Sequence, residues 1–417
     1  AELPELLMLA SYVDCIAKQN DHIFPKLEIV VTNSIDSVDA DIVGFSDWLH
    51  NHSSCLEQAK KAKEKNAFVV FGGPYASAMA NAIDKKYEFI DSIVVGHGFR
   101  PLCNIVKKLH KGKAVNKKIV ADDRPIALPA YDLSYVDSRI DSKNKAIMFA
   151  SFGCIKQKPC IFCNPLPFMT FNFYKEQFEK LNSVKRITII DEVMISFCND
   201  KLVNAAKNSN SKLEIVTSSE YFYADSIDYN STSKKLEKLE DKLVAMHYYA
   251  THADKKIWQK ARNNELIRHG SIKLRIKNTV KSLLNNTDAV IHVYFILGLP
   301  GETEKTLKQC LDFAYSLLGL GTGKIKSTGE GKSRVRVYFD LPDIVPGTQL
   351  YEILKKHSQL ADNAELNDTV WQPEVRQQLL REAIHYLTKI EYDDIVEAVQ
   401  AIKTETSNIF CNIFCYA

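Results

Sequence analysis

The sequence predicts an α/β protein with two consecutive strand-and-helix domains and a helical C-terminal region. Between residues 41 and 96, three short β-rich runs end in glycine and alternate with helical patterns. From residue 146 to residue 340, six further strand candidates alternate with helices, and Glu374–Lys389 has a helical pattern. We therefore expect domains at 1–115 and 143–345, a linker at 116–142 and a helical region at 346–417.

In the first domain the alternation predicts a doubly wound, Rossmann-like parallel sheet. A helix over 6–18 and a strand at 27–32 come first. The other strands are expected at 41–45, 67–73 and 90–96, with helices at 53–65 and 76–86. Domains of this kind usually open with a strand, and none precedes the first helix here. Either the N-terminus is shortened or the sheet has one strand fewer.

The second domain has the pattern of a (β/α)6 partial barrel, a relative of the eightfold barrel in which chemistry occurs at the carboxyl ends of the strands. Its strands are expected at 146–153, 186–191, 213–218, 243–249, 290–297 and 334–340. Its helices are expected at about 174–182, 199–208, 234–240, 254–263 and 303–318.

Composition excludes several classes of partner. The chain has 417 residues, 54 of them basic and 51 acidic, and its formal charge of +3 provides no electrostatic footprint for nucleic acid or an anionic membrane. No apolar run reaches the roughly 18 residues that span a bilayer, and Ala1-Glu2-Leu3-Pro4 does not begin a signal peptide. We expect a cytoplasmic protein that binds neither nucleic acid nor membrane.

Three of the ten cysteines form a motif, Cys154-x5-Cys160-x2-Cys163, where the strand 146–153 ends. Three thiolates on a [4Fe-4S] cluster leave one iron without a protein ligand, free to bind a small molecule. The alternative, a closed zinc site, needs a fourth ligand, and no suitable Cys or His pair follows nearby. The other seven are scattered or terminal, and Cys411 and Cys415 form a tail pair with a redox or metal role as one option.

The motif resembles that of the radical S-adenosylmethionine superfamily, in which three cysteines after the first barrel strand hold the cluster. Its usual spacing is Cys-x3-Cys-x2-Cys, so this chain has two extra residues in the first interval. Cys160-Ile161-Phe162-Cys163 matches well, including the aromatic residue before the last cysteine. The resemblance implies that the cluster's open iron chelates S-adenosylmethionine and that Phe162 lies near the adenine.

The resemblance extends to other strand ends and implies further contacts to S-adenosylmethionine. Gly298-Leu299-Pro300-Gly301-Glu302-Thr303 looks like the superfamily's turn after the fifth strand, where Gly298, Pro300 and Gly301 approach the adenosine. At the end of the second strand, Asp191 or Glu192 would contact the amino group. The fourth strand of many relatives carries a ribose-binding Glu-Ser; here Thr251 or His252 substitutes, unless His252 is simply a hydrogen-bonded structural residue.

The first domain resembles the cobalamin-binding domain that precedes the barrel in one branch of the superfamily. The matching segments follow its three strands. They supply the expected cobalamin-binding residues Gly44, Ser46, Gly72, Gly73, Pro74, Ser77, Gly96, His97 and Gly98. Glycines at the carboxyl ends of parallel strands leave a crevice for a large planar ligand. No Asp-x-His-x-x-Gly motif offers an axial histidine to cobalt, and a domain that retained the fold but lost the cofactor is the alternative.

Together these resemblances imply a class B radical S-adenosylmethionine methyltransferase that methylates an unactivated carbon of a small molecule or peptide. An electron donor such as flavodoxin or ferredoxin would reduce the cluster. The alternatives are a radical enzyme without cobalamin that catalyses another rearrangement or cyclisation, and a zinc-binding interaction protein. The sequence indicates neither a catalytic base nor the substrate, and Tyr294, Trp258 and Trp371 are expected in the core.

Overall fold

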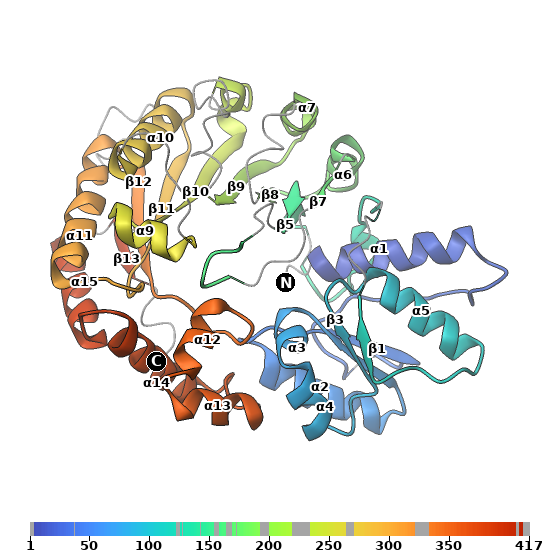
Figure 1. Cartoon of the computed structure of the whole chain (residues 1–417). Coiled ribbons are helices and arrows are strands. Elements are labelled where there is room, and N and C mark those ends of the chain that lie inside the picture. The colour runs from blue at the N-terminus through green and yellow to red at the C-terminus, as the bar shows by residue number, and fades with distance from the viewer. Residues whose placement is uncertain are drawn as a thin grey trace.

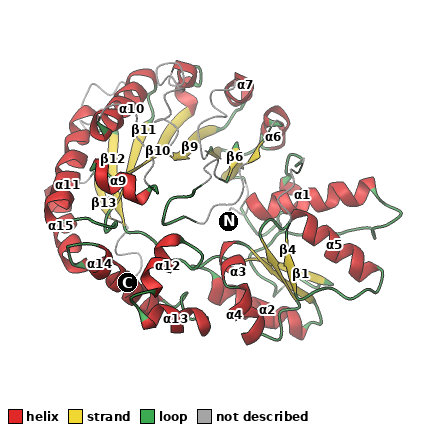
Figure 2. Ribbon diagram, in the orientation of Figure 1, coloured by secondary structure: helices red, strands yellow, loops and turns green. Residues whose placement is uncertain are grey.

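The computed structural model describes residues 4–36, 38–121, 126, 128–141, 143–153, 158–163, 169–171, 173–191, 200–218, 234–263, 271–321, 333–405 and 408–411. It has the predicted α/β fold, with a small parallel sheet near the N-terminus and a larger, strongly curved parallel sheet after it (Figures 1 and 2). No helix in these ranges is long and apolar enough to cross a membrane.

The N-terminal sheet contains four parallel strands in the order β1-β2-β3-β4. They are β1 (Ile42–Ser46), β2 (Phe68–Gly72), β3 (Ser92–Val95) and β4 (Lys118–Val120). The helices of this part are α1 (Pro4–Gln19), α2 (His52–Glu64), α3 (Pro74–Ala78), α4 (Ala80–Lys86) and α5 (Phe99–His110).

Helices cover both faces of the N-terminal sheet because alternate strand residues point to opposite faces and nearly all are apolar. Phe71 and Ile93 belong to the main core, on the face that α2 and α3 cover. Val70 and Val94 form a separate cluster with Ile105 of α5 on the other face. Helix α1 packs against α5 (Figure 1).

Two secondary-structure expectations for the N-terminal part were wrong, and the expected linker contains regular structure. Residues 27–32 form no strand of the sheet; Val31 forms an isolated bridge with Val136, in which its N–H donates to the Tyr135 carbonyl and its carbonyl accepts from the Asp137 N–H. The expected linker, 116–142, contains the sheet strand β4 and the short 3-10 helix η1 (Leu133–Tyr135). The single helix expected at 76–86 is two helices, α3 and α4, that meet at Met79.

The second sheet is a partial barrel of seven parallel strands, in the order β13-β12-β11-β10-β9-β8-β5. The strands are β5 (Lys145–Phe149), β8 (Arg186–Ile190), β9 (Lys212–Ser218), β10 (Leu243–Thr251), β11 (Val290–Ile296), β12 (Val335–Asp340) and β13 (Ile409–Cys411). A short antiparallel pair, β6 (Ser151–Phe152) and β7 (Met169–Thr170), follows β5. All six expected strands are present, and β13 from the C-terminal region is an addition.

The helices of the partial barrel are α6 (Tyr174–Lys180), α7 (Asp200–Asn208), α9 (Lys255–Ala261), α10 (Ile272–Asn286) and α11 (Glu304–Leu318), with the 3-10 helices η4 (Glu240–Lys242) and η5 (Gly319–Gly321). Helices α10 and α11 pack on the convex face of the partial barrel, and α9 lies at its carboxyl edge (Figure 1). Helix α10 was not predicted, although its apolar residues Ile272, Ile276, Val280 and Leu283 recur at helical spacing. Residues such as Ile291, Val293 and Phe295 alternate along each strand and are completely buried on this face.

The C-terminal region is mainly helical, as expected. It comprises α12 (Gln349–Lys355), α13 (Gln359–Leu366), α14 (Pro373–Leu387) and α15 (Tyr392–Glu405) before β13 completes the larger sheet. Helices α13 and α14 approach the N-terminal domain, so the C-terminal region contacts both domains (Figure 1).

Candidate functional site

Two of the three predicted cluster cysteines lie in one turn at the carboxyl edge of the barrel. Cys160 is buried, Cys163 is half-buried, and the Cys163 backbone N–H donates to the Cys160 carbonyl at 2.9 Å. The turn is fixed on both sides, because Ile161 N–H donates to Ala261 of α9 and its carbonyl accepts from Leu350 of α12. Cys154 lies outside the described residues. Among the described residues, no three His, Cys, Asp or Glu side chains form a metal-binding group.

Phe162 links this turn to the end of β11. Its ring packs in a small cluster with Ile257, Ala261 and Leu299, next to Ile296. Leu299 belongs to the Gly298–Glu302 segment, so two motifs that are 136 positions apart in the sequence lie side by side. Because both follow the carboxyl ends of barrel strands, they lie where barrel enzymes build their active sites.

The Gly298–Glu302 turn is held by a buried carboxylate. Glu302 is completely buried, and its Oε2 accepts from the Gly298 N–H at 2.6 Å. Gly298 and Gly301 have positive φ angles of 74° and 85°. A Cβ at Gly298 would lie 3.1 Å from Ile384, and one at Gly301 would lie 2.5 Å from Lys260 Nζ. The positive φ favours glycine at both positions, and at Gly298 the Ile384 side chain also restricts the space, whereas the flexible Lys260 side chain could move away from Gly301.

His252 is bound to the same carboxylate. Its Nε2 lies 2.8 Å from Glu302 Oε1, and its Nδ1 accepts the Asp254 N–H at 3.0 Å. The ring is completely buried, and both nitrogens are engaged by the protein. These contacts favour a structural role for His252 over a role in binding ribose. Through Glu302, His252 positions the Gly298–Glu302 turn. Glu302 was not singled out as a functional residue, although it stands in the quoted motif.

Thr251 has a strained backbone. Its φ is +60°, a conformation that β-branched residues rarely adopt, and the register of β10 shifts between Tyr249 and Thr251. Thr251 is buried beside the turn that His252 supports. Strain of this kind persists only where the surrounding structure enforces it, and it clusters at ligand sites.

Asp191 lies at the end of β8, as predicted. It is completely buried, accepts a hydrogen bond from the Ser151 hydroxyl at 2.6 Å, and donates its backbone N–H to Val216. Ser151 follows β5, so Asp191 connects the first strand of the barrel to its neighbours. Glu192, the alternative, lies outside the described residues.

Most of the predicted cobalamin residues lie at or just after the carboxyl ends of β1, β2 and β3, while Gly44 lies within β1, and several of them have local roles. Ser77 Oγ accepts the Gly96 N–H at 3.1 Å, and Ser46 Oγ accepts the Trp48 ring N–H at 3.1 Å. A Cβ at Gly73 would lie 2.7 Å from the Asp47 backbone.

The remaining positions of the set differ in how much space surrounds them. A Cβ at Gly44 would meet nothing within 4 Å, one at Gly72 would lie 3.9 Å from Val94, and one at Gly98 would lie 3.7 Å from Leu9. Pro74 begins α3, and His97 is buried beside Phe99. Of the glycines in the set, Gly44 therefore has the most open surroundings.

A buried charged network lies beside these glycines and was not predicted. Nδ1 of His52 lies 2.8 Å from Asp47 Oδ1, and its Nε2 lies 3.0 Å from Asp368 Oδ2 in the C-terminal region. The Tyr75 hydroxyl donates to Asp368 Oδ1 at 2.7 Å. Because both ring nitrogens face carboxylates, His52 is an imidazolium. Burial alone would lower its pKa, but its hydrogen bonds to Asp368 and Asp47 outweigh burial and raise the pKa to about 9.

The concave face of the barrel carries a row of stacked aromatic rings. Tyr249, Tyr294, Tyr338 and Phe410 stand in register on four neighbouring strands, with ring centroids 4.6, 4.5 and 4.8 Å apart. Tyr294, expected in the core, is only partly buried on this inner face. Apolar and aromatic residues alternate along β10 to β12, and this alternation could have predicted the aromatic row from the sequence.

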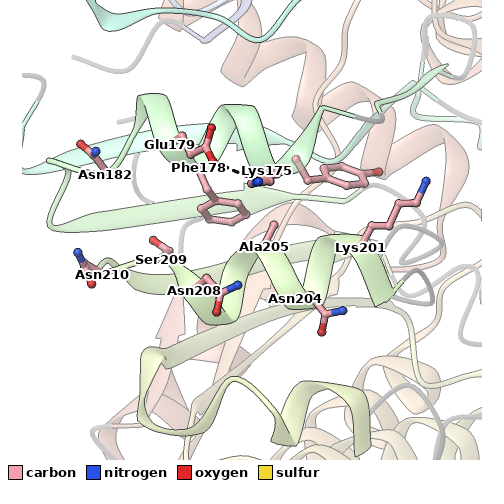
Figure 3. Close-up of a pocket in the computed structure, with 11 residues that line it drawn as sticks. Lys175, Phe178, Glu179, Asn182, Lys201, Asn204, Ala205, Asn208, Ser209 and Asn210 are labelled. Atoms are coloured by element: carbon pink, nitrogen blue, oxygen red, sulfur yellow. Dashed lines mark ion pairs between the residues drawn. The ribbon is translucent and has the colours of Figure 1, made fainter.

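A groove of about 580 Å³ lies elsewhere, between α6 and α7 on the outer side of the barrel (Figure 3). Phe178 and Ala205 form its floor, and asparagines such as Asn182, Asn204 and Asn208 surround it. Because it lies between helices and not at the strand ends, it is separate from the candidate site.

The fold and this edge of the barrel can now be compared with known proteins. No protein-family model matches the sequence. The fold is similar to that of structures of a radical S-adenosylmethionine methyltransferase. That methyltransferase is TsrM from Kitasatospora setae.

The TsrM structure with cobalamin and a [4Fe-4S] cluster bound has a TM-score of 0.58 and 15% identity, covering 83% of this chain and 74% of TsrM. The structure with tryptophan substrate and the S-adenosylmethionine analogue aza-SAM has a TM-score of 0.57 and 13% identity, covering 85% and 73%. At these identities the likeness shows the fold, and it confirms the predicted fold class.

One curated protein also matches. An uncharacterized methyltransferase of Pyrococcus horikoshii is 25% identical over 155 residues, which are 32% of this chain and 33% of that protein. The match thus covers about a third of the relative's length.

Proposed function

We propose that this protein is a cobalamin-dependent radical S-adenosylmethionine enzyme that methylates an unactivated carbon of a small molecule or peptide. The observation that carries the proposal is the contact between the cysteine turn and the Gly298–Glu302 turn through Phe162 and Leu299. It occurs at the carboxyl edge of a partial barrel whose fold is similar to that of TsrM.

Two of the three expected cluster ligands, Cys160 and Cys163, are among the described residues, and their arrangement is compatible with an iron–sulfur cluster. Cys160 and Cys163 bring two soft thiol ligands into one tight turn, which backbone hydrogen bonds to α9 and α12 hold in place. Cys154 would be the third ligand. When bound, the cluster and S-adenosylmethionine would supply one-electron chemistry, and cobalamin would supply the methyl group.

The chain's own residues would position these groups and exclude water. Phe162 offers an aromatic ring beside Leu299, where the adenine is expected. Glu302, through Gly298 and His252, sets the backbone of the turn that the adenosine would approach. Asp191 is a buried carboxylate near the first strand, suited to a cationic amino group.

The N-terminal domain would hold cobalamin with the turns that follow its strands and beside Gly44, a residue within β1 that leaves open space. Flavodoxin or ferredoxin would be the electron donor. A radical enzyme that binds no cobalamin is the second candidate, and it is favoured by one observation: protein atoms already occupy the space beside Gly73.

Anaerobic reconstitution with iron and sulfide tests the proposal. We expect the wild type to bind about four iron and four sulfide per chain and to give, after reduction, the electron paramagnetic resonance signal of a [4Fe-4S]⁺ cluster. Cys163→Ala should lose this signal. Cys103→Ala, which removes a buried thiol from α5, is the control and should keep it. One zinc per chain without sulfide would contradict the proposal.

A further inference from the structure

Helix α9, at the carboxyl edge of the barrel, has a basic outer side (Figure 1). Lys255, Lys256 and Lys260 are exposed, whereas Ile257 and Ala261 are buried in the small hydrophobic cluster beside the cysteine turn. Lys256 and Lys260 are one helical turn apart, so their side chains stand on the same side of the helix. The helix therefore turns an apolar side inward and three ammonium groups toward solvent.

These three ammonium groups are not neutralised by ion pairs. Other lysines of the chain form close pairs, such as Lys355 with Glu365 at 3.0 Å. Within the part of the chain that the structure describes, Lys255, Lys256 and Lys260 form none. Their charge is therefore available to a partner in solution.

Two further exposed lysines border the same edge of the barrel. Lys158 precedes Pro159, whose carbonyl accepts from the side-chain amide of Asn263, two residues after α9 ends. Lys389 follows α14, and its backbone N–H donates to the Glu302 carbonyl at 2.8 Å. These two lysines and the three of α9, which we call the basic surface, thus border both turns of the candidate site.

Carboxylates next to the basic surface offset its charge only in part. Asp254 Oδ1 accepts the backbone N–H groups of Lys256 and Ile257 at 2.8 and 3.1 Å, so its role is to cap α9. Glu304 is exposed in the first turn of α11. The five lysines therefore leave a positive patch on a chain whose whole formal charge is only +3.

The basic surface lies close to the cysteine turn. The carbonyl of Ala261, the last residue of α9, accepts the Ile161 N–H at 2.9 Å, so the α9 lysines and the turn lie on two sides of one helix. An α-helix with its side chains is about 10 Å across. Electrons pass between proteins only over short separations, and a protein docked on these lysines would be about one helix diameter from the turn.

We infer that the basic surface is the docking site of a small acidic protein that carries single electrons. The carrier would lose one electron, and an oxidised [4Fe-4S]²⁺ cluster would gain it. Calling the partner an electron carrier rests on the proposed function, whereas its acidic character rests on the lysines. A nucleic acid fits less well, because Trp258, the aromatic residue of α9, is buried and offers no stacking platform.

Calorimetric titration of the iron- and sulfide-reconstituted chain with oxidised flavodoxin, an acidic carrier, tests the inference. We expect one flavodoxin to bind per chain at low ionic strength, and added salt to weaken the binding. Cytochrome c, a basic electron carrier, is the control and should not bind.

Charge-reversal variants locate the docking site. Lys255→Glu/Lys256→Glu should weaken flavodoxin binding at least about five-fold at low salt. Both positions are in the first turn of α9, where acidic residues suit the helix, and circular dichroism checks the fold. Lys277→Glu/Lys281→Glu on α10 changes the net charge equally and should bind like the wild type.

A milder variant and a second measurement support the first. Lys255→Gln/Lys256→Gln removes the two charges without reversing them and should weaken binding about two-fold or more. Reduction of the cluster by reduced flavodoxin should slow in Lys255→Glu/Lys256→Glu, whereas dithionite, a small reductant that needs no docking site, should reduce all variants at the same rate.

No flavodoxin binding to the wild type, equal binding of cytochrome c, or unchanged flavodoxin binding in the folded α9 variants would overturn the inference. Tighter binding of polyuridylate than of flavodoxin, lost in the same variants, would overturn it by assigning the surface to nucleic acid. A wild type that assembles no cluster would instead refute the proposed function. The two failures are distinguishable because flavodoxin binding is measured by heat and requires no cluster signal.

Discussion

At the scale of single residues, Gly73 after β2 and Gly44 within β1 have different reasons to be glycine. Gly73 has φ 101° and ψ 176°, a conformation essentially restricted to glycine, and protein backbone fills the space beside it. Gly44 has open space and an ordinary backbone. Local structure therefore accounts for the glycine at position 73. At position 44 it does not, and space for a bound ligand is the remaining reason for a glycine.

Alanine substitutions separate these two roles. Gly73→Ala should lower the free energy of unfolding by at least about 2 kcal/mol, because it combines backbone strain with a clash against Asp47. Gly44→Ala should change it by less than about 0.5 kcal/mol. Urea unfolding measures both. Similar effects of the two substitutions would show that local packing does not govern these positions.

The sequence showed the motif segments but not the partners of their residues. The Cys160–Cys163 and Gly298–Glu302 segments were recognisable because their spacing is local. The pairing of His252 with Glu302, or of His52 with Asp368, joins side chains that are 50 and 316 positions apart. No local pattern encodes such a contact, so the buried networks became visible only in the fold.

At the scale of elements, length decided what could be predicted. The barrel strands β8 to β12 are apolar runs of five to nine residues, buried by helices on one face, and all were expected. Strands β4 and β13 have three residues each, too few to show a period. Residues 27–32 have strand composition, yet Val31 pairs with Val136 outside the sheet. Whether residues 27–32 join the sheet therefore depends on which segment lies next to them in the fold, and their composition does not show this.

At the scale of the whole molecule, the His52 network joins the N-terminal domain to the C-terminal region. Asp47 and Tyr75 follow strands of the first sheet, and Asp368 precedes α14. Lys86 adds hydrogen bonds to the Asn367 and Asp368 carbonyls. Buried charges are strongly destabilising when one partner is removed, so this network fixes how the two parts sit together.

The network should make stability depend on pH. A histidine whose folded pKa is raised stabilises fully below its unfolded pKa, near 6.5, and that contribution is lost as pH rises through about 9. Wild type should therefore exceed His52→Gln in unfolding free energy by about 3 kcal/mol at pH 6 and by much less at pH 10.

Urea unfolding across that range measures the difference. His110→Gln, which changes an exposed histidine at the end of α5, is the control and should follow the wild-type curve. A difference between wild type and His52→Gln that stays constant with pH would show that His52 is not charged.

The most direct test of the proposed methyltransferase follows one methyl group. The chain is reconstituted with iron, sulfide and hydroxocobalamin without oxygen, desalted, reduced, and incubated with S-adenosylmethionine that carries a trideuterated methyl group. Mass spectrometry of the protein-bound corrinoid is the measurement. We predict trideuteromethylcobalamin on the wild type, with close to one corrinoid per chain. A chain that assembles its [4Fe-4S] cluster but retains no corrinoid, or never acquires the labelled methyl group, would contradict the account.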